Sequence, residues 1–194
     1  MSNFYIADTH INHANCLRFD NRPFSTVEEM NEALITNWNS VVTNNDVVYI
    51  LGDWIWGKVN EQYLQIAASL NGNKVLIVGN HDPKQIDKGL RNGTRIVELS
   101  PLKEIVEDDG SHIILCHYPM PFFRCNYRGD FYMFCGHVHT SKEDAYLEDL
   151  RRTLRENCHE FGDNLGQIVN VGCMKPYMNY TPQKFETLKK VCQA

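Results

Sequence analysis

The sequence has no long apolar run, no excess of basic residues and no CxxC pair, and each absence excludes a class of protein. A helix that spans a bilayer needs about 20 consecutive apolar residues, and no run in the chain approaches that length. The first residues contain neither a basic segment nor a long apolar core, so we expect no signal peptide. The net charge of −5 argues against a broad surface for long nucleic acid or for an anionic membrane.

Cysteine usage indicates a reducing compartment. The seven cysteines are an odd number, whereas a secreted disulfide framework normally has an even number in a shorter chain. We therefore expect free thiols and a cytoplasmic location. The length suits a single domain over residues 1–194, and the hydrophobic fraction of 43% is ordinary for a globular protein.

Short apolar runs recur along the chain, and each ends in a polar cluster. The runs are rich in β-branched and aromatic residues and are flanked by Gly, Asn or Asp, which is typical of strands buried on both faces. The predicted strands are Phe4–Ala7, Val47–Leu51, Val75–Val78, Ile113–Cys116, Phe131–Cys135 and Ile168–Val171. Asp108-Asp109-Gly110 predicts a hairpin turn before the fourth of them.

Helical patterns alternate with the first strands. Ser25 and Glu28 predict a capping box, and an apolar stripe follows at Met30, Leu34, Trp38 and Val41. Further helices are predicted after the cap Asn60, over 141–156, and from Thr181-Pro182. This order favours a layered α/β protein with mixed sheets.

Side chains that can bind metal follow five of the predicted strands. They are Asp8 and His10, then Asp53, then Asn80 and His81, then His117, and finally His137 and His139. Loops beyond the carboxyl ends of strands converge in layered α/β sheets, so we expect these side chains to meet.

The donor set is too large for one ion. Three Asp or Asn oxygens and four imidazoles exceed the needs of a four-coordinate site and suit two ions about 3.5–4 Å apart, with Asp53 as the bridge. Mixed oxygen and imidazole donors favour two divalent ions, with Mn first and Fe, Zn or Ni as alternatives.

Five sequence blocks resemble the signature of the calcineurin-like metallophosphoesterases. They are Asp8-Thr9-His10, Gly52-Asp53, Gly79-Asn80-His81-Asp82, His117 and Gly136-His137-Val138-His139, in the order of that family. Two further stretches are similar to a small bacterial and phage subgroup, Asn21-Arg22-Pro23-Phe24 and Asn170-Val171-Gly172-Cys173. The resemblance implies a four-layer α/β/β/α sandwich of two mixed sheets.

The resemblance also implies how the ligands divide. One ion would be held by Asp8, His10, Asp53 and His139, and the other by Asp53, Asn80, His117 and His137. His81 would lie beside the substrate phosphate, where it could stabilise charge or protonate the leaving oxygen as the catalytic acid. The nucleophile would be a hydroxide that bridges the two ions.

One departure from the family pattern bears on the substrate. Many members continue Gly-Asp-x-x-Asp-Arg, whereas this chain has Gly52-Asp53-Trp54-Ile55-Trp56-Gly57. The usual partner of the catalytic histidine and a phosphate-binding arginine are thus missing there, which argues against protein phosphatase activity. We expect His13, Arg22 and Arg124 to bind substrate, with Arg128 and Lys175 as alternatives.

The predicted function is hydrolysis of a phosphate monoester or diester in a small compound, with a nucleotide as one candidate. The absence of a basic stripe favours a small substrate over a long nucleic acid. A nuclease of the same family and a non-catalytic scaffold of the same fold are the alternatives. Trp54 and Trp56 either pack in the core or line a pocket, and core packing is the commoner role. The oligomeric state stays open, and a homodimer is the commonest arrangement.

Overall fold

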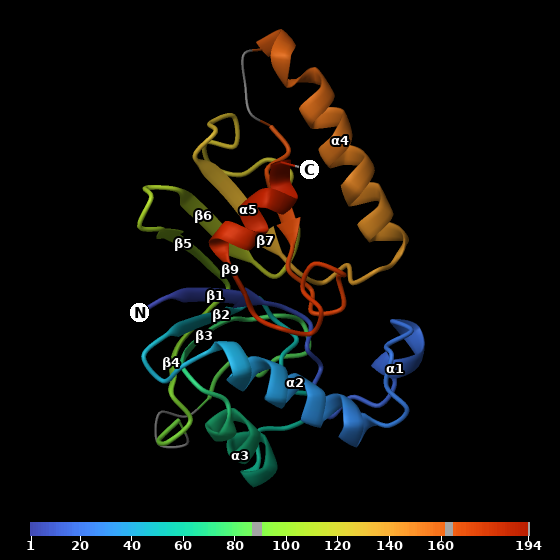
Figure 1. Ribbon diagram of the computed structural model, residues 1–194, viewed down its shortest axis with the longest axis vertical. Helices are drawn as coiled ribbons and strands as arrows, with labels where there is room; N and C mark the ends of the chain where they lie inside the picture. Colours follow the sequence, from blue (N-terminus) through green and yellow to red (C-terminus); the bar gives the residue numbers. More distant parts are fainter. Residues whose placement is uncertain (87–90, 162–164, 194) are drawn as a thin grey trace.

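The computed structural model describes residues 1–86, 91–161 and 165–193, and these contain two sheets (Figure 1). The first sheet has the order β4-β3-β2-β1-β9, with bounds Ile96–Ser100, Asn73–Ile77, Val47–Ile50, Asn3–Ile6 and Gln183–Lys184. The second has the order β5-β6-β7-β8, with bounds Leu102–Val106, His112–Cys116, Phe131–Cys135 and Ile168–Asn170. The six predicted strands and the hairpin are confirmed.

Both sheets are mixed, as the sequence predicts. Strands β1 to β4 are parallel, and β9 pairs antiparallel with β1. The hairpin β5–β6 is antiparallel, whereas β6, β7 and β8 are parallel. The carboxyl ends of β1, β2 and β3 therefore share one edge of their sheet, and those of β6 and β7 share one edge of the other.

The two sheets face each other across a shared core. The ring of Tyr5 in β1 meets that of Phe134 in β7 edge-on, with centroids 5.0 Å apart. All five residues of β7 are buried, which explains its continuous apolar sequence. Burial of these rings from both sheets fixes the distance between the layers.

Helices complete the α/β architecture. Helices α2 (Val27–Val41) and α3 (Glu61–Ser69) lie on the outer side of the first sheet, and α4 (Lys142–Phe161) lies beyond the second (Figure 1). Helix α5 (Phe185–Gln193) contacts β8, β9 and β1, so it spans the edges of both sheets. The short helix α1 (Cys16–Phe19) follows the β1 loop.

Two predicted helix starts are wrong. Helix α2 is capped by Thr26, whose hydroxyl accepts from Glu29 N at 3.1 Å, so the capping pair lies one residue later than Ser25 and Glu28. The predicted apolar stripe holds for three residues, but Val41 is 39% exposed and Val42 is buried instead. The last helix does not open at Thr181-Pro182, because residues 183–184 pair with β1 first.

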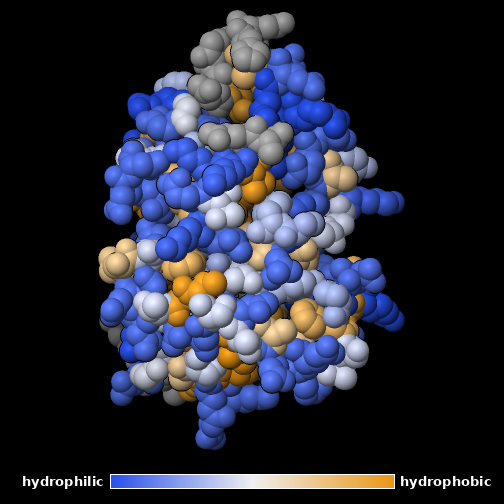
Figure 2. Space-filling model, in the orientation of Figure 1, coloured by the Kyte–Doolittle hydropathy of each residue, from blue (hydrophilic) through white to orange (hydrophobic). Residues whose placement is uncertain are grey.

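The surface is mostly polar where it is visible. On the face shown in Figure 2, hydrophilic residues cover most of the area, and hydrophobic residues form only small groups. Within the described ranges, none of the helices is long and apolar enough to cross a membrane. The seven cysteines are free thiols, as expected.

Candidate metal centre

The loops that carry the predicted ligands have an unusual backbone. Five of the seven predicted ligands adopt positive φ angles: Asp8 (54°), His10 (48°), Asp53 (51°), His137 (70°) and His139 (49°). This region costs an L-residue about 1–2 kcal/mol, and such strain persists where the surrounding structure enforces it, often at functional sites. The turns direct these side chains to one place.

Asp8, His10, Asp53 and His139 form the first group of donors. Their ligand atoms all lie within 4.8 Å of one another. His139 Nε2 is 3.3 Å from His10 Nε2 and 3.8 Å from Asp8 Oδ1. Three of the four residues are buried, and the loops after β1, β2 and β7 bring the four together at one nearly enclosed point.

A second group of donors lies around His117. His117 Nε2 is 3.0 Å from Asn80 Oδ1 and 3.7 Å from Asp53 Oδ2. The His137 ring lies 5.0 Å from the His117 ring, at 70° to it. The same oxygen, Asp53 Oδ2, is 3.6 Å from His10 Nε2. Asp53 thus stands between the two groups of donors.

The orientation of the His117 ring suits the second group of donors to a cation. His117 Nδ1 lies 2.8 Å from the carbonyl oxygen of Leu51. Because a carbonyl only accepts, Nδ1 carries a proton, and the ring turns Nε2 toward Asn80 Oδ1 and Asp53 Oδ2. A ring nitrogen and two oxygens that converge in this way can surround a divalent ion.

Burial strengthens this argument at the first group. Burial lowers the pKa of His10 to about 2, aided by the charge of nearby His139, so the His10 ring is neutral. Burial also raises the pKa of Asp8 to about 6, against the opposing effect of His139. Two carboxylates and several imidazoles in a desolvated site form a set that suits divalent Mn, Fe, Zn or Ni.

The first group has a supporting partner that sequence reasoning missed. Asp20 accepts from His139 Nδ1 at 2.8 Å, which directs Nε2 of that ring toward the other donors. Burial opposes ionisation of Asp20, but the bond from His139 and the charge of Arg22 lower its pKa. Asp20 follows a helix of only four residues, so no periodic pattern singles it out.

Arg22 supports Asp20 and the loop that follows β1, which corrects the expectation that Arg22 binds substrate. Its side chain is buried and donates to Asp20 Oδ2 at 2.8 Å from Nη2 and at 3.0 Å from Nε. It also donates to the carbonyl oxygens of Asp8 and Thr9, at 2.8 and 2.7 Å. The guanidinium therefore holds the first ligand loop from within the protein.

Asp82 holds the loops that follow β2 and β3, as Arg22 holds the loop that follows β1. Its carboxylate accepts from the backbone N–H groups of Asp53, Trp54 and Gly79 at 2.7–3.0 Å. Asp53 Oδ1 in turn accepts from His81 N at 2.9 Å, which leaves Oδ2 for the donor groups. No separate role for Asp82 was predicted from the sequence, and the structure places it in this network.

Two glycines permit the close approach of these loops. Gly52 has a φ of 86°, and a Cβ there would overlap His117 Nδ1 and lie 2.8 Å from Gly79 Cα. A Cβ on Gly136 would lie 2.6 Å from Asp8 Oδ2. Any larger residue at either position would displace a predicted ligand.

His81 and His13 lie at the open side of the centre. The exposed His81 ring is 5.7 Å from the His10 ring and 4.8 Å from the Trp56 ring. The His13 ring stacks on Trp56 at 3.7 Å and 3°, and its Nδ1 is 3.4 Å from His10 Nδ1. Trp54 is fully buried in the core, so the two tryptophans have different roles.

Arg124 lies away from the centre, which corrects the expectation that it binds substrate there. It pairs with Glu104 at 2.7 Å, and its guanidinium lies over the ring of Phe131, the first residue of β7. His137 follows the other end of β7, and a five-residue strand spans roughly 15 Å. Arg128 pairs with Asp130 at the same remote end.

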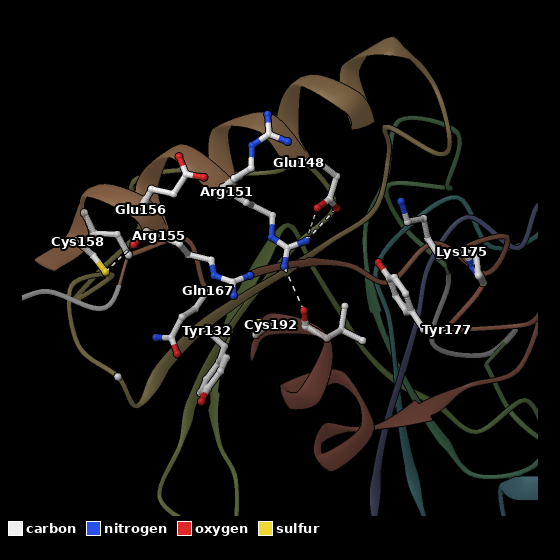
Figure 3. Close-up of a pocket in the computed structure, with 15 residues that line it drawn as sticks. Tyr132, Glu148, Arg151, Arg155, Glu156, Cys158, Gln167, Lys175, Tyr177 and Cys192 are labelled. Atoms are coloured by element: carbon white, nitrogen blue, oxygen red, sulfur yellow. Dashed lines mark hydrogen bonds and ion pairs between the residues drawn. The ribbon is translucent and has the colours of Figure 1, made fainter. Parts of the chain in front are cut away.

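A separate cavity of about 1110 Å³ lies between α4, α5 and β7 (Figure 3). In it, Arg151 pairs with Glu148 at 2.7 Å, as Figure 3 shows. The cavity reaches the ligand loops only indirectly. Lys175 pairs with Asp144 at 2.7 Å, Asp144 accepts from Asn170, and Asn170 donates to the carbonyl oxygen of His139. Lys175 therefore supports the His139 loop.

Two facing mixed sheets, with buried carboxylates and imidazoles gathered on their strand-end loops, define the class of metal-dependent phosphoesterases. The chain belongs to the calcineurin-like phosphoesterase family, whose sequence profile matches residues 4–141. The family and the α/β fold expected from the five sequence blocks are confirmed.

The chain is also similar to two further proteins and to one solved structure. An uncharacterized protein, MJ1445, of Methanocaldococcus jannaschii is 38% identical over 144 residues, which cover 74% of this chain and 72% of that protein. The gene 66 protein of Mycobacterium phage L5 is 38% identical over 85 residues, 42% of this chain and 41% of that protein. The crystal structure of AQ665, a protein of unknown function from Aquifex aeolicus, has the same fold, with a TM-score of 0.66, 24% identity and coverage of 97% and 98%.

Proposed function

We propose that this protein hydrolyses phosphate esters of small compounds with two divalent metal ions, Mn in the first instance. The observation that carries the proposal is the position of Asp53 Oδ2, 3.6 Å from His10 Nε2 and 3.7 Å from His117 Nε2. One carboxylate oxygen between two sets of donors is what a bridged pair of ions requires.

Each of the two groups of donors would hold one ion, and Asp53 would belong to both. Asp8, His10, Asp53 and His139 would hold one ion, and Asp53, Asn80, His117 and His137 the other. Ions bound there would activate a water molecule and neutralise charge on the phosphoryl oxygens. The chain contributes the buried, rigid loops that keep the donors in place, with Asp20, Arg22 and Asp82 behind them.

His81 is the group we assign as the acid. It is exposed beside His10, and its backbone is fixed by the bond from its N–H to Asp53. From this position the His81 ring can protonate the leaving oxygen, or donate a hydrogen bond to the phosphoryl group as charge develops. His13, on the same open side, is the remaining candidate for a substrate contact.

The test compares metal content with turnover. Purified protein with added Mn²⁺ is expected to bind two ions per chain and to release phosphate or an alcohol from a panel of monoesters and diesters, including nucleotides. Asp53→Asn is expected to lose both bound ions and turnover. Asp149→Asn makes the same chemical change on the exposed face of α4 and serves as the matched control, with wild-type values expected. If the protein bound two ions but hydrolysed none of the esters, that result would contradict the proposal.

His81→Ala separates the acid from the metal ligands. General acid catalysis contributes about 10²–10⁴-fold, so the variant should lose that factor with alkyl esters while both ions stay bound. Nitrophenolate leaves without a proton, so the loss with p-nitrophenyl esters should be much smaller. An unchanged rate with alkyl esters would mean that His81 is not the acid. Turnover of a single-stranded oligonucleotide alone would identify a nuclease instead.

A further inference from the structure

Exposed aromatic rings border the metal centre. Phe19, Trp56 and Tyr118 are 54%, 39% and 45% exposed. Each ring nevertheless contacts a histidine of the donor set. Single exposed apolar residues are common and need no explanation, but several aromatic rings around one polar site form a surface suited to a ligand.

Phe19 and Trp56 lie beside the first donor group. The Phe19 ring is 5.6 Å from the His139 ring, in an edge-on arrangement. The Trp56 ring is 6.2 Å from the His10 ring and 4.8 Å from the His81 ring. His13 stacks flat on Trp56 and fixes the orientation of the indole. These rings therefore adjoin the group that we assign as the acid.

Tyr118 lies beside the second donor group. Its ring is 4.6 Å from the His137 ring and 5.0 Å from the His117 ring, at 67° and 72° to them. Phe19 and Trp56 contact histidines of the first group, whereas Tyr118 contacts those of the second, and Asp53 stands between the two groups. An aromatic surface is thus available next to each half of the centre.

We propose that the substrate is a phosphodiester with a flat aromatic group on each side of the scissile phosphate, as in a dinucleotide. This inference rests on the proposed function and names the substrate class of the same site. Stacking of bases on aromatic side chains is tolerant of base identity, and the net charge of −5 favours a short ligand over a long strand.

The position of His81 determines which of the two ester groups leaves and which stays on the phosphate. Because His81 adjoins Trp56, the leaving group lies against Phe19 and Trp56, and the retained group lies against Tyr118. Water adds to phosphorus, the P–O bond to the leaving group breaks, and the leaving oxygen takes a proton from His81. The proton released by water restores His81, and the products are an alcohol and a phosphate monoester.

The test uses two diesters that break the same bond. Phenyl p-nitrophenyl phosphate and cyclohexyl p-nitrophenyl phosphate both release p-nitrophenolate, and their retained groups are of similar size but only one is flat. With Mn²⁺ present, wild-type protein is expected to have a KM about tenfold lower for the phenyl diester, a difference within the range of one aromatic stacking contact.

Variants of Tyr118 assign that preference to the ring. Tyr118→Ala and Tyr118→Leu are expected to bring the two KM values together, whereas Tyr118→Phe should keep the tenfold difference because it keeps the ring. Phe122→Ala is the matched control, since Phe122 is 76% exposed and lies four residues further along the chain. It should leave both KM values unchanged.

The outcomes separate this inference from the proposed function. Equal KM values for the two diesters in the wild type, or a preference that survives in both Tyr118→Ala and Tyr118→Leu, would overturn the two-ring substrate while hydrolysis itself stands. Greater kcat/KM for p-nitrophenyl phosphate than for either diester would likewise replace it with a monoester. No metal-dependent release of nitrophenolate from any of the three compounds would remove the proposed function as well.

Discussion

Asp20 accepts a hydrogen bond from Nδ1 of the His139 ring, with 2.8 Å between Asp20 Oδ1 and His139 Nδ1. The opposite nitrogen, Nε2, is thereby directed to Asp8 and His10. A carboxylate behind a ligating imidazole fixes the tautomer and the ring orientation, and it makes the imidazole a stronger donor.

The first prediction follows from this pair. Asp20→Asn keeps the size of the side chain but removes its charge, so the affinity for Mn²⁺ should fall about 10–100-fold. Calorimetric titration of metal-free protein measures this directly. Asp130→Asn, which changes an exposed carboxylate paired with Arg128, should leave the affinity unchanged. Equal affinities in both variants would contradict a role for Asp20 in orienting His139.

Gly52 gives a second prediction with a close internal control. Gly52 and Gly110 have φ angles of 86° and 83°, so alanine costs a similar backbone strain at each, about 1 kcal/mol relative to an unstrained position. Only at Gly52 would the Cβ overlap His117. Gly52→Ala should therefore lose metal binding and turnover as well as stability, whereas Gly110→Ala should lose stability alone. Parallel thermal unfolding and metal analysis of both variants test the difference.

A third prediction concerns the two arginines whose expected roles the structure corrects. Arg22→Met leaves Asp20 buried without its cation, a change that typically costs about 3–5 kcal/mol. The same substitution at Arg124 breaks an exposed pair with Glu104 and should cost less than about 1 kcal/mol. Urea unfolding measures both free energies. An Arg124→Met variant with a clearly raised KM would restore Arg124 to the substrate site.

The acid stability of the protein provides a fourth prediction. Asp46 accepts from the N–H and hydroxyl groups of Thr43 and from Ser2 N, at 2.7–2.9 Å. Burial opposes ionisation, but these bonds outweigh it and lower the pKa of Asp46 below 3.8. The stabilisation is therefore complete above pH 4 and is lost as the pH falls through the lower, folded-state pKa. Asp46→Asn should flatten the decline in unfolding free energy over that range. A decline as steep as in the wild type would contradict this account.

Strand prediction from the sequence succeeded where local chemistry and tertiary burial agree. The run Phe131–Cys135 is apolar at every position and is buried at every position, so composition alone was sufficient. Strand β4 was not predicted because Glu98 interrupts its short apolar run, and only Ile96 in it is buried. The helix start at Thr181-Pro182 failed because pairing with β1 overrides the local preference of that dipeptide.

Site residues were likewise predicted where local sequence identifies them and missed where their role depends on distant contacts. The predicted ligands were visible because each follows a strand, and parallel strands bring their carboxyl ends together. Asp20 was missed because its role depends on contact with His139, 119 residues away. Arg22 and Arg124 were grouped as phosphate contacts because charge was the only property that the sequence offered for them.

Residue types and their spacing along the chain were enough to identify the side chains that can bind metal and the strand ends that they follow, because strand formation and turn chemistry are local. The packed fold was needed to show which of the polar residues face the donors, which support them from behind and which lie elsewhere. That choice depends on distances between segments far apart in the chain, and on the burial that shifts the pKa of Asp8 and His10. Neither quantity exists until the two sheets pack against each other.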